Sequence, residues 1–210
     1  MYNGLFIVFE GIDGAGLSTH AALLQDYLEK KGFEVVLTKE PTDGLIGGLI
    51  KAALRGEWRT DPQTLQLLFA ADRSHHVEHY IVPALKEGKV VISDRYMYSS
   101  FAYGSLSCDY EWLKRINSKF PKADMLILLD LEPEIAIRRI KRGRFGFELF
   151  EDIKRLHRVR SNYLKILEEY SGFIVNTNRS IKEVHGEIVR IVERALEKSA
   201  LKTKEGSEPT

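Results

Sequence analysis

The 210-residue chain has little cysteine, little net charge and no long apolar segment. Its single cysteine, Cys108, excludes an intrachain disulfide and is typical of a reducing compartment. The net charge of +1 argues against a broad surface for nucleic acid, so any anion site should be local. No apolar run approaches the length of a membrane span, and no secretory signal precedes the first apolar run. These absences predict a cytoplasmic protein that has no membrane or nucleic-acid partner.

Metal-ligating and hydrolytic signatures are also missing. The only histidine cluster, His75, His76 and His79 with Glu78, lacks the residue order of a zinc peptidase helix. We interpret these histidines as surface or packing residues. No serine–histidine–acid set and no cysteine nucleophile stands out, so the chemistry is to be sought elsewhere in the chain.

Apolar runs alternate with helical patterns along the whole chain. Strands are predicted at residues 5–10, 33–38, 89–93, 123–131 and 173–176. This alternation predicts an α/β fold, with a five-stranded parallel sheet covered by helices on both faces. Residues 1–198 are predicted to form one domain. A basic segment at about 141–150 is predicted to act as a lid, and the polar residues 199–210 to be a disordered tail.

A glycine-rich turn joins the first predicted strand to the first predicted helix. Gly11, four further residues, Gly16 and then Ser18 reproduce the spacing of a phosphate-binding loop, although Leu17 occupies the usual lysine position. Backbone N–H groups at such a helix start attract phosphate, and Ser18 can cap the helix or bind Mg²⁺. The alternative is a tight connection without a ligand, which three glycines in this context disfavour.

Two further pairs of residues fit a nucleotide site. Asp94 and Arg95 follow a predicted central strand, where an arginine can grip a phosphate with two hydrogen bonds; the alternative is a surface ion pair. Phe69 and Arg73 share a helix face, so that one can stack on a base while the other binds its edge. Core packing is the alternative for Phe69, but a buried arginine needs a partner.

Four arginines gather in and before the predicted lid. A solvated basic face is one interpretation. The other is a closing lid that stabilises charge on a transferring phosphoryl group. These residues are Arg138, Arg139, Arg142 and Arg144.

Taken in order, these segments resemble the thymidylate kinases, over about residues 4–196. The resemblance implies a P-loop nucleoside monophosphate kinase fold, transfer of the ATP γ-phosphate to dTMP to give dTDP, a requirement for Mg²⁺, and a homodimer. The segments that carry it are Phe9 to Gly16, Glu40-Pro41, Leu68 to Arg73, Ser93 to Tyr96, Ser99-Ser100, Ala102-Tyr103, Phe147-Glu148, Arg158 to Arg160 with Tyr163, and Val184 to Ile188.

The resemblance also implies roles for individual residues. The implied ATP site comprises Gly11, Ile12, Asp13, Gly14, Ala15, Gly16, Leu17, Ser18, Thr19, Arg138, Asn178 and Arg179. The implied dTMP site comprises Asp13, Glu40, Pro41, Phe69, Arg73, Arg95, Ser99, Ser100 and Tyr103. The implied catalytic residues are Arg95, Asp13 and a lid arginine, Arg142 or Arg144, because the turn carries Gly14 where some members have an arginine. Ser18 and Asp94 are the implied metal ligands.

Two positions depart from the family pattern. Gly104 stands where many members have glutamine, and Leu17 replaces the loop lysine. Our hypothesis is an active kinase in which Arg95, the lid arginines, Mg²⁺ and Lys39 share the missing charge. One alternative is a non-catalytic nucleotide-binding paralogue; another is a kinase for a different nucleotide or nucleoside.

Overall fold

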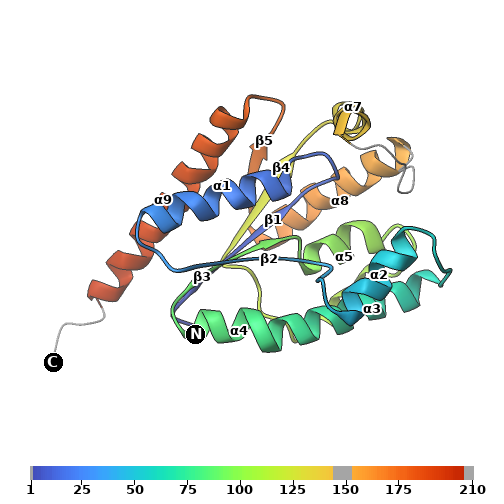
Figure 1. The fold of residues 1–210 in the computed structure, drawn as a ribbon, viewed down its shortest axis with the longest axis horizontal. Coiled ribbons are helices and arrows are strands. Elements are labelled where there is room, and N and C mark those ends of the chain that lie inside the picture. The colour runs from blue at the N-terminus through green and yellow to red at the C-terminus, as the bar shows by residue number, and fades with distance from the viewer. Residues whose placement is uncertain (1, 144–152, 206–210) are drawn as a thin grey trace.

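The computed structural model describes residues 2–143 and 153–205, and its centre is a five-stranded sheet (Figure 1). All neighbouring strands are parallel, in the order β2-β3-β1-β4-β5. This confirms the predicted sheet. The strands are β1 (Leu5–Glu10), β2 (Val35–Lys39), β3 (Val90–Asp94), β4 (Met125–Asp130) and β5 (Phe173–Asn176).

Helices cover both faces of this sheet. On one face α1 packs against β2, β3 and α9, and on the other α4 lies against β3 while α8 lies against β4 (Figure 1). The helices before the lid are α1 (Leu17–Lys30), α2 (Leu45–Leu54), α3 (Pro62–His76), η1 (Val77–Ile81), α4 (Val82–Lys86), α5 (Met97–Gly104), α6 (Tyr110–Asn117) and α7 (Pro133–Gly143). Those after it are α8 (Ile153–Tyr170) and α9 (Ile181–Glu205).

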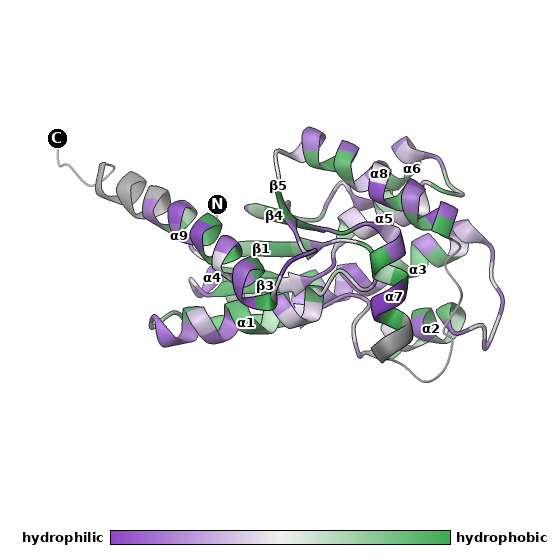
Figure 2. Ribbon diagram, turned by 90° about the horizontal axis from the view of Figure 1, so that it is seen from above, coloured by the Kyte–Doolittle hydropathy of each residue, from purple (hydrophilic) through white to green (hydrophobic). Residues whose placement is uncertain are grey.

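The central strands are apolar because helices bury both of their faces. Figure 2 shows β1 and β3 as apolar strands, whereas α1 and α9 carry polar residues as well. Parallel pairing places the carboxyl ends of the strands at one edge, where ligands bind in such sheets. Glu10, Asp94, Asp130 and Asn176 end four of the strands there.

Several element boundaries differ from those predicted. Helix α1 begins at Leu17, and its N-cap is Gly16 in a left-handed conformation, so Ser18 is not the cap. The helix that begins at Pro62 is followed by the π-helical segment η1, after which the Val82 N–H donates to the Val77 carbonyl five residues earlier and α4 begins, with Pro83 in its first turn. At the other end of the chain, α9 runs to Glu205, beyond the predicted start of the tail.

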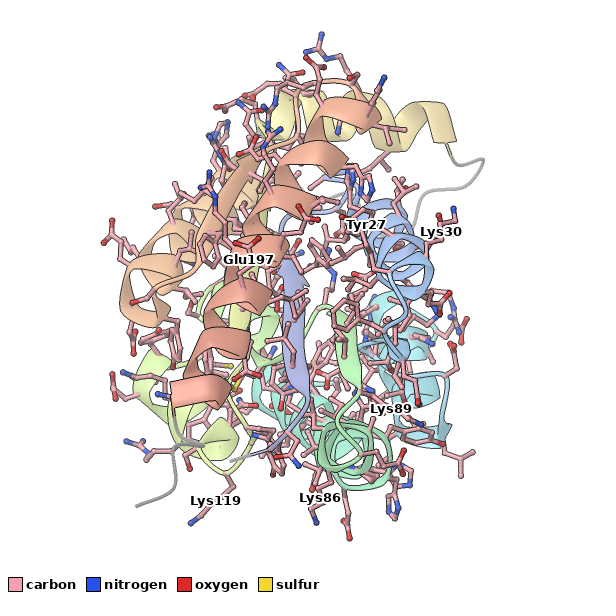
Figure 3. The ribbon with its side chains drawn as sticks, turned by 90° about the vertical axis from the view of Figure 1, so that its left-hand side faces the viewer. Tyr27, Lys30, Lys86, Lys89, Lys119 and Glu197 are labelled. Carbon is pink, nitrogen blue, oxygen red and sulfur yellow. The ribbon has the colours of Figure 1, made fainter. Side chains whose placement is uncertain are left out.

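Charged side chains at the surface of the molecule point into solvent. Lys30, Lys86 and Lys119 extend away from the molecule (Figure 3). Within residues 2–143 and 153–205, no helix is long and apolar enough to cross a membrane.

Candidate active site

The phosphate loop is built from glycines that approach other backbone atoms closely. Gly14 and Gly16 have φ values of 82° and 97°, which favour glycine. A Cβ atom at Gly11 would lie 2.6 Å from the Leu129 carbonyl oxygen, and one at Gly14 would lie 2.8 Å from that of Ala136. The turn therefore sits directly against β4 and α7, at the start of α1, as an anion site requires.

Leu17 does not project over this loop. Its side chain is 5% exposed and belongs to the hydrophobic core. Its Cδ1 atom lies 3.3 Å from where a Cβ of Gly11 would stand, so the side chain packs beneath the loop. The loop consequently offers a phosphate backbone N–H groups and the α1 dipole, without a cation at position 17.

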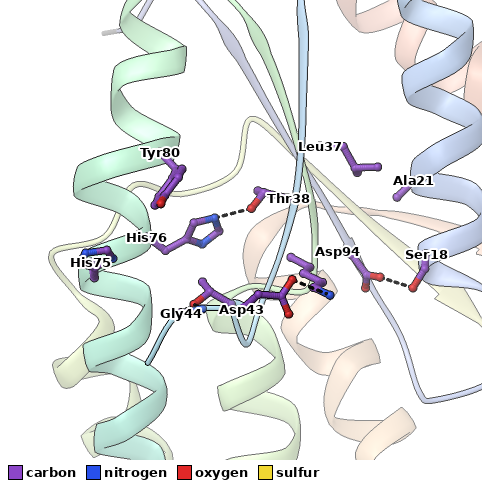
Figure 4. A pocket seen from close by; sticks show the side chains of 12 residues that line it. Ser18, Ala21, Leu37, Thr38, Asp43, Gly44, His75, His76, Tyr80 and Asp94 are labelled. Carbon is purple, nitrogen blue, oxygen red and sulfur yellow. Dashed lines mark hydrogen bonds and ion pairs between the residues drawn. The ribbon is translucent and has the colours of Figure 1, made fainter. Parts of the chain in front are cut away.

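Ser18 and Asp94 come together at the carboxyl edge of the sheet. The Ser18 hydroxyl donates to Asp94 Oδ2 at 2.5 Å, which explains why Ser18 does not cap α1 (Figure 4). Asp94 pairs in the sheet with Lys39, whose Nζ lies 3.1 Å from Asp43. All four residues line a cavity of about 700 Å³. A hydroxyl and a carboxylate at the end of a phosphate loop are oxygen ligands that suit Mg²⁺.

Arg95 contacts the phosphate loop at Gly11 and, outside the loop, the ring of Tyr103 on α5. It has a φ of 71°, unusual for a bulky residue and found mostly where the surroundings enforce it. Its own N–H donates to the Phe9 carbonyl at 2.9 Å. Its guanidinium donates to the Gly11 carbonyl at 2.8 Å and to Asp13 Oδ1 at 2.7 Å. The Arg95 side chain is therefore held at the mouth of the loop.

Glu10 lies beneath Arg95 and is fully buried. Its carboxylate accepts hydrogen bonds from the Tyr96 N–H, the Ser99 N–H and hydroxyl, and the Tyr163 hydroxyl. Burial raises the pKa of the Glu10 carboxyl to about 7, although Arg95 and these donors act in the opposite direction. Glu10 thus fixes the start of α5, which carries several predicted acceptor residues.

Arg73 is the centre of a second, buried network. It is 1% exposed. Its Nε donates to Glu40 Oε2 at 2.8 Å, and its Nη1 donates to Asn117 Oδ1 at 2.5 Å. The Ser100 hydroxyl lies 3.4 Å from Nη2. The structure therefore brings together Glu40, Arg73 and Ser100, and the buried arginine has the partner that it needs.

His76 extends this network and was interpreted from the sequence only as a surface or packing residue. It is 1% exposed, with Nδ1 3.0 Å from Glu40 Oε1 and Nε2 2.6 Å from the Thr38 hydroxyl. Because a carboxylate only accepts, the His76 Nδ1–H donates to Glu40. The helical spacing of Arg73 and His76 was the one sequence signal for this residue. Nothing in the sequence signalled Asn117.

The other predicted acceptor residues lie around these two networks. Phe69 and Tyr103 are half-buried, and the Tyr103 ring is 5.6 Å from the Arg95 guanidinium. Ser99 bonds Glu10, as above. Pro41 follows Glu40 through a cis peptide bond. Phe69 lies on α3 and Tyr103 on α5, two helices that pack together.

Several residues predicted to bind ATP, among them Arg138, Asn178 and Arg179, lie outside the phosphate loop. The Arg138 Nε donates to the Glu134 carbonyl of its own helix. Its neighbour Arg139, one of the four arginines in and before the predicted lid, donates to the Gly14 and Thr177 carbonyls at 3.4 and 2.7 Å. Thr19 is exposed on α1, and Asn178 is exposed in the loop after β5.

Arg179 contacts groups of its own segment, namely the Asn176 carbonyl and Glu187. Arg144 and most of the predicted lid lie outside the described residues, and so does the side chain of Arg142.

Comparison with known proteins gives the family of this chain. The family model for thymidylate kinase matches residues 9–188. A probable thymidylate kinase of Pyrococcus horikoshii is 48% identical over 200 residues, covering 92% of this chain and 98% of that protein. One from Thermococcus gammatolerans is 46% identical with the same coverage. Probable thymidylate kinase 1 of Saccharolobus solfataricus is 44% identical, covering 90% and 97%. The chain therefore belongs to the thymidylate kinase family.

Proposed function

We propose that this chain transfers the γ-phosphoryl group of ATP to dTMP, giving dTDP and ADP. The observation that carries the proposal is the position of Arg95. Its guanidinium bonds Gly11 of the phosphate loop and Asp13, and the same side chain neighbours Tyr103 on the acceptor side. One arginine therefore stands where a donor phosphate and an acceptor phosphate would meet.

On the donor side, the loop amides and the α1 dipole would hold the ATP phosphates. Ser18 and Asp94, joined by their hydrogen bond, would hold Mg²⁺, which neutralises charge between the phosphates when it is bound. Arg139 would support the loop through the Gly14 carbonyl. A lid arginine, Arg142 or Arg144, would complete the charge stabilisation.

On the acceptor side, Phe69 would stack on thymine and Arg73 would donate to a base carbonyl. Tyr103 would lie beside the sugar and favour deoxyribose. Arg95 would hold the acceptor phosphate, and Asp13, fixed by Arg95, would orient the acceptor region. The ion pair between Arg73 and Glu40 supports this arrangement, because it fixes the guanidinium before the substrate arrives.

The direct test is a coupled assay of ADP release with ATP, Mg²⁺ and dTMP. We expect dTMP to be the preferred acceptor over dUMP, dCMP and thymidine. Arg95→Ala should lower kcat/KM by about 100-fold, the effect of losing one charge-stabilising donor. Wild-type turnover no faster than that of Arg95→Ala would contradict the proposal.

A second candidate is a nucleotide-binding protein without catalysis. The observation that favours it is Leu17, whose side chain is buried in the core and offers no donor to a phosphate. Tight ATP binding without ADP release would support this reading.

We also propose that the chain forms a homodimer and acts in the cytoplasm. Leu45, Leu49 and Leu67 are 93%, 51% and 50% exposed on α2 and α3, two helices that pack together. Large apolar side chains exposed on two packed helices make these helices the candidate surface for a partner. Light scattering would report the mass, and Leu49→Glu with Leu67→Glu should give a monomer.

A further inference from the structure

Gln66 is a buried side chain that the proposed function does not yet use. It lies on α3, seven residues before Arg73, and is 7% exposed. Its Oε1 atom has no hydrogen-bond partner among the residues that the structure describes. An unpaired buried carbonyl oxygen destabilises the folded protein, so its retention needs a reason.

The position of Gln66 links it to the acceptor region. Residues 66, 69 and 73 lie on neighbouring turns of one face of α3. Arg73 forms one layer with Ser100 of α5 and Asn117 of α6. Gln66 forms the next layer, against Gly104 of α5, beside Leu113 of α6. The buried Gln66 amide therefore lies on the same face of α3 as Phe69 and Arg73, in the layer next to that of Arg73.

Gly104 makes room for this amide. A Cβ atom at position 104 would lie 2.9 Å from Gln66 Cδ and 3.1 Å from its Oε1. Gly104 does not have a positive φ, so its backbone does not require glycine. The space that Gly104 leaves is filled by the end of the Gln66 side chain.

The chemistry of the base supplies the missing partner. Thymine presents an N3–H donor between two carbonyl oxygens. Arg73 is a donor only and can bind a carbonyl but not the N3–H, and Phe69 has no polar side-chain atom. Asn117 Oδ1 and the Ser100 hydroxyl oxygen already accept from Arg73. We propose that Gln66 Oε1 accepts the hydrogen bond from the base N3–H, and thereby helps Arg73 to select imide bases over cytosine, whose N3 has no hydrogen. This inference rests on the proposed function.

Steady-state kinetics with dTMP and N3-methyl-dTMP test the assignment. Gln66→Met keeps the length of the side chain and removes the acceptor, and should raise KM for dTMP about tenfold with little change in kcat. The same variant should leave KM for N3-methyl-dTMP unchanged, because that base has no N3–H to lose. Gln63→Met, on the exposed side of α3, is the matched control and should behave as wild type.

Gly104→Ala provides an independent variant. It favours the helix but displaces the Gln66 amide, so it should raise KM for dTMP without lowering the melting temperature. A KM for dTMP that is unchanged in Gln66→Met would overturn the inference. Equal increases for both bases would also overturn it, because they indicate packing alone. If the wild type does not turn over dTMP, the proposed function fails. The role of Gln66 is then decided by binding: a dTMP dissociation constant that is higher for Gln66→Met than for the wild type supports the inference, and an equal one overturns it.

Discussion

The phosphate loop and the predicted acceptor region are built in different ways. The loop consists of backbone groups kept in place by close packing, and its one atypical side chain, Leu17, faces the core. The acceptor region consists of buried charged and polar side chains that bond one another, with Arg73, Glu40, His76 and Asn117 all at most 5% exposed. A loop made of amides tolerates a changed side chain, whereas a buried network leaves an unpaired group whenever one member changes.

The largest expected effect follows from breaking the buried ion pair. Arg73→Met leaves the Glu40 carboxylate buried without its guanidinium, and should destabilise the fold by about 3–5 kcal/mol, a fall in Tm of about 10 °C. Calorimetry measures the shift. Adding Glu40→Gln removes the unpaired charge and should restore part of the stability. If Arg73→Met alone were as stable as the wild type, the acceptor region would tolerate a changed side chain as well as the loop does.

Glu10 lies between the two regions, and its titration should be visible in stability. Its folded pKa of about 7 exceeds the ordinary value of 4.5, so the folded state binds its proton more tightly than the unfolded state does. The resulting stabilisation is fully present below pH 4.5 and is lost as pH rises through 7, a change of roughly 3 kcal/mol. Urea unfolding between these pH values should show this slope in the wild type and not in Glu10→Gln. Identical slopes would contradict the prediction.

Leu17→Lys tests the loop in the opposite direction, by adding a cation. A lysine stem can leave the core and place its ammonium at the phosphates. The added charge-assisted hydrogen bond, about 1.5–3 kcal/mol, should raise kcat/KM for ATP tenfold or more. Leu17→Met controls for packing. A silent wild type that gains activity would favour the nucleotide-binding alternative, and a loss of activity would show that the loop needs an apolar residue here.

The smallest effect is expected at the edge of the acceptor network. Asparagine at position 76 can place a donor where His76 Nδ1 meets Glu40, whereas glutamine places its amide where Nε2 meets Thr38. His76→Asn should therefore keep KM for dTMP near the wild-type value. His76→Gln should raise it about fivefold, the worth of one hydrogen bond of about 1 kcal/mol. If His76→Asn raised KM for dTMP and His76→Gln did not, the contact of His76 with Thr38 would be the important one.

Local patterns in the sequence were sufficient for the sheet and for the phosphate loop. Alternating apolar runs and glycine spacing fix which segments become strands and where the turn lies, because both depend on neighbouring residues. The bounds predicted for β1 agree with the structure, Leu5–Glu10. Local residues also set the start of α3, where Asp61 accepts from the Thr64 N–H and Pro62 lies in the first turn.

Contacts between distant segments could not be predicted in this way. Ser18 looked like a cap, but the tertiary structure brings Asp94 within 2.5 Å and redirects the hydroxyl. Arg139 looked no different from Arg138 until α7 was placed over the loop. His76 showed its role only once Glu40 and Thr38, which are on another element, lay beside it.

The sequence by itself determined that this protein has a parallel α/β sheet with a phosphate loop at its carboxyl edge, and that the loop lacks a lysine. The tertiary structure alone decided where the Leu17 side chain lies and which buried side chains pair in the acceptor region. The physical reason is the distance along the chain over which each kind of interaction acts. Strand, helix and turn formation follow from residues a few positions apart, whereas burial and hydrogen bonding depend on which surfaces the complete fold brings together.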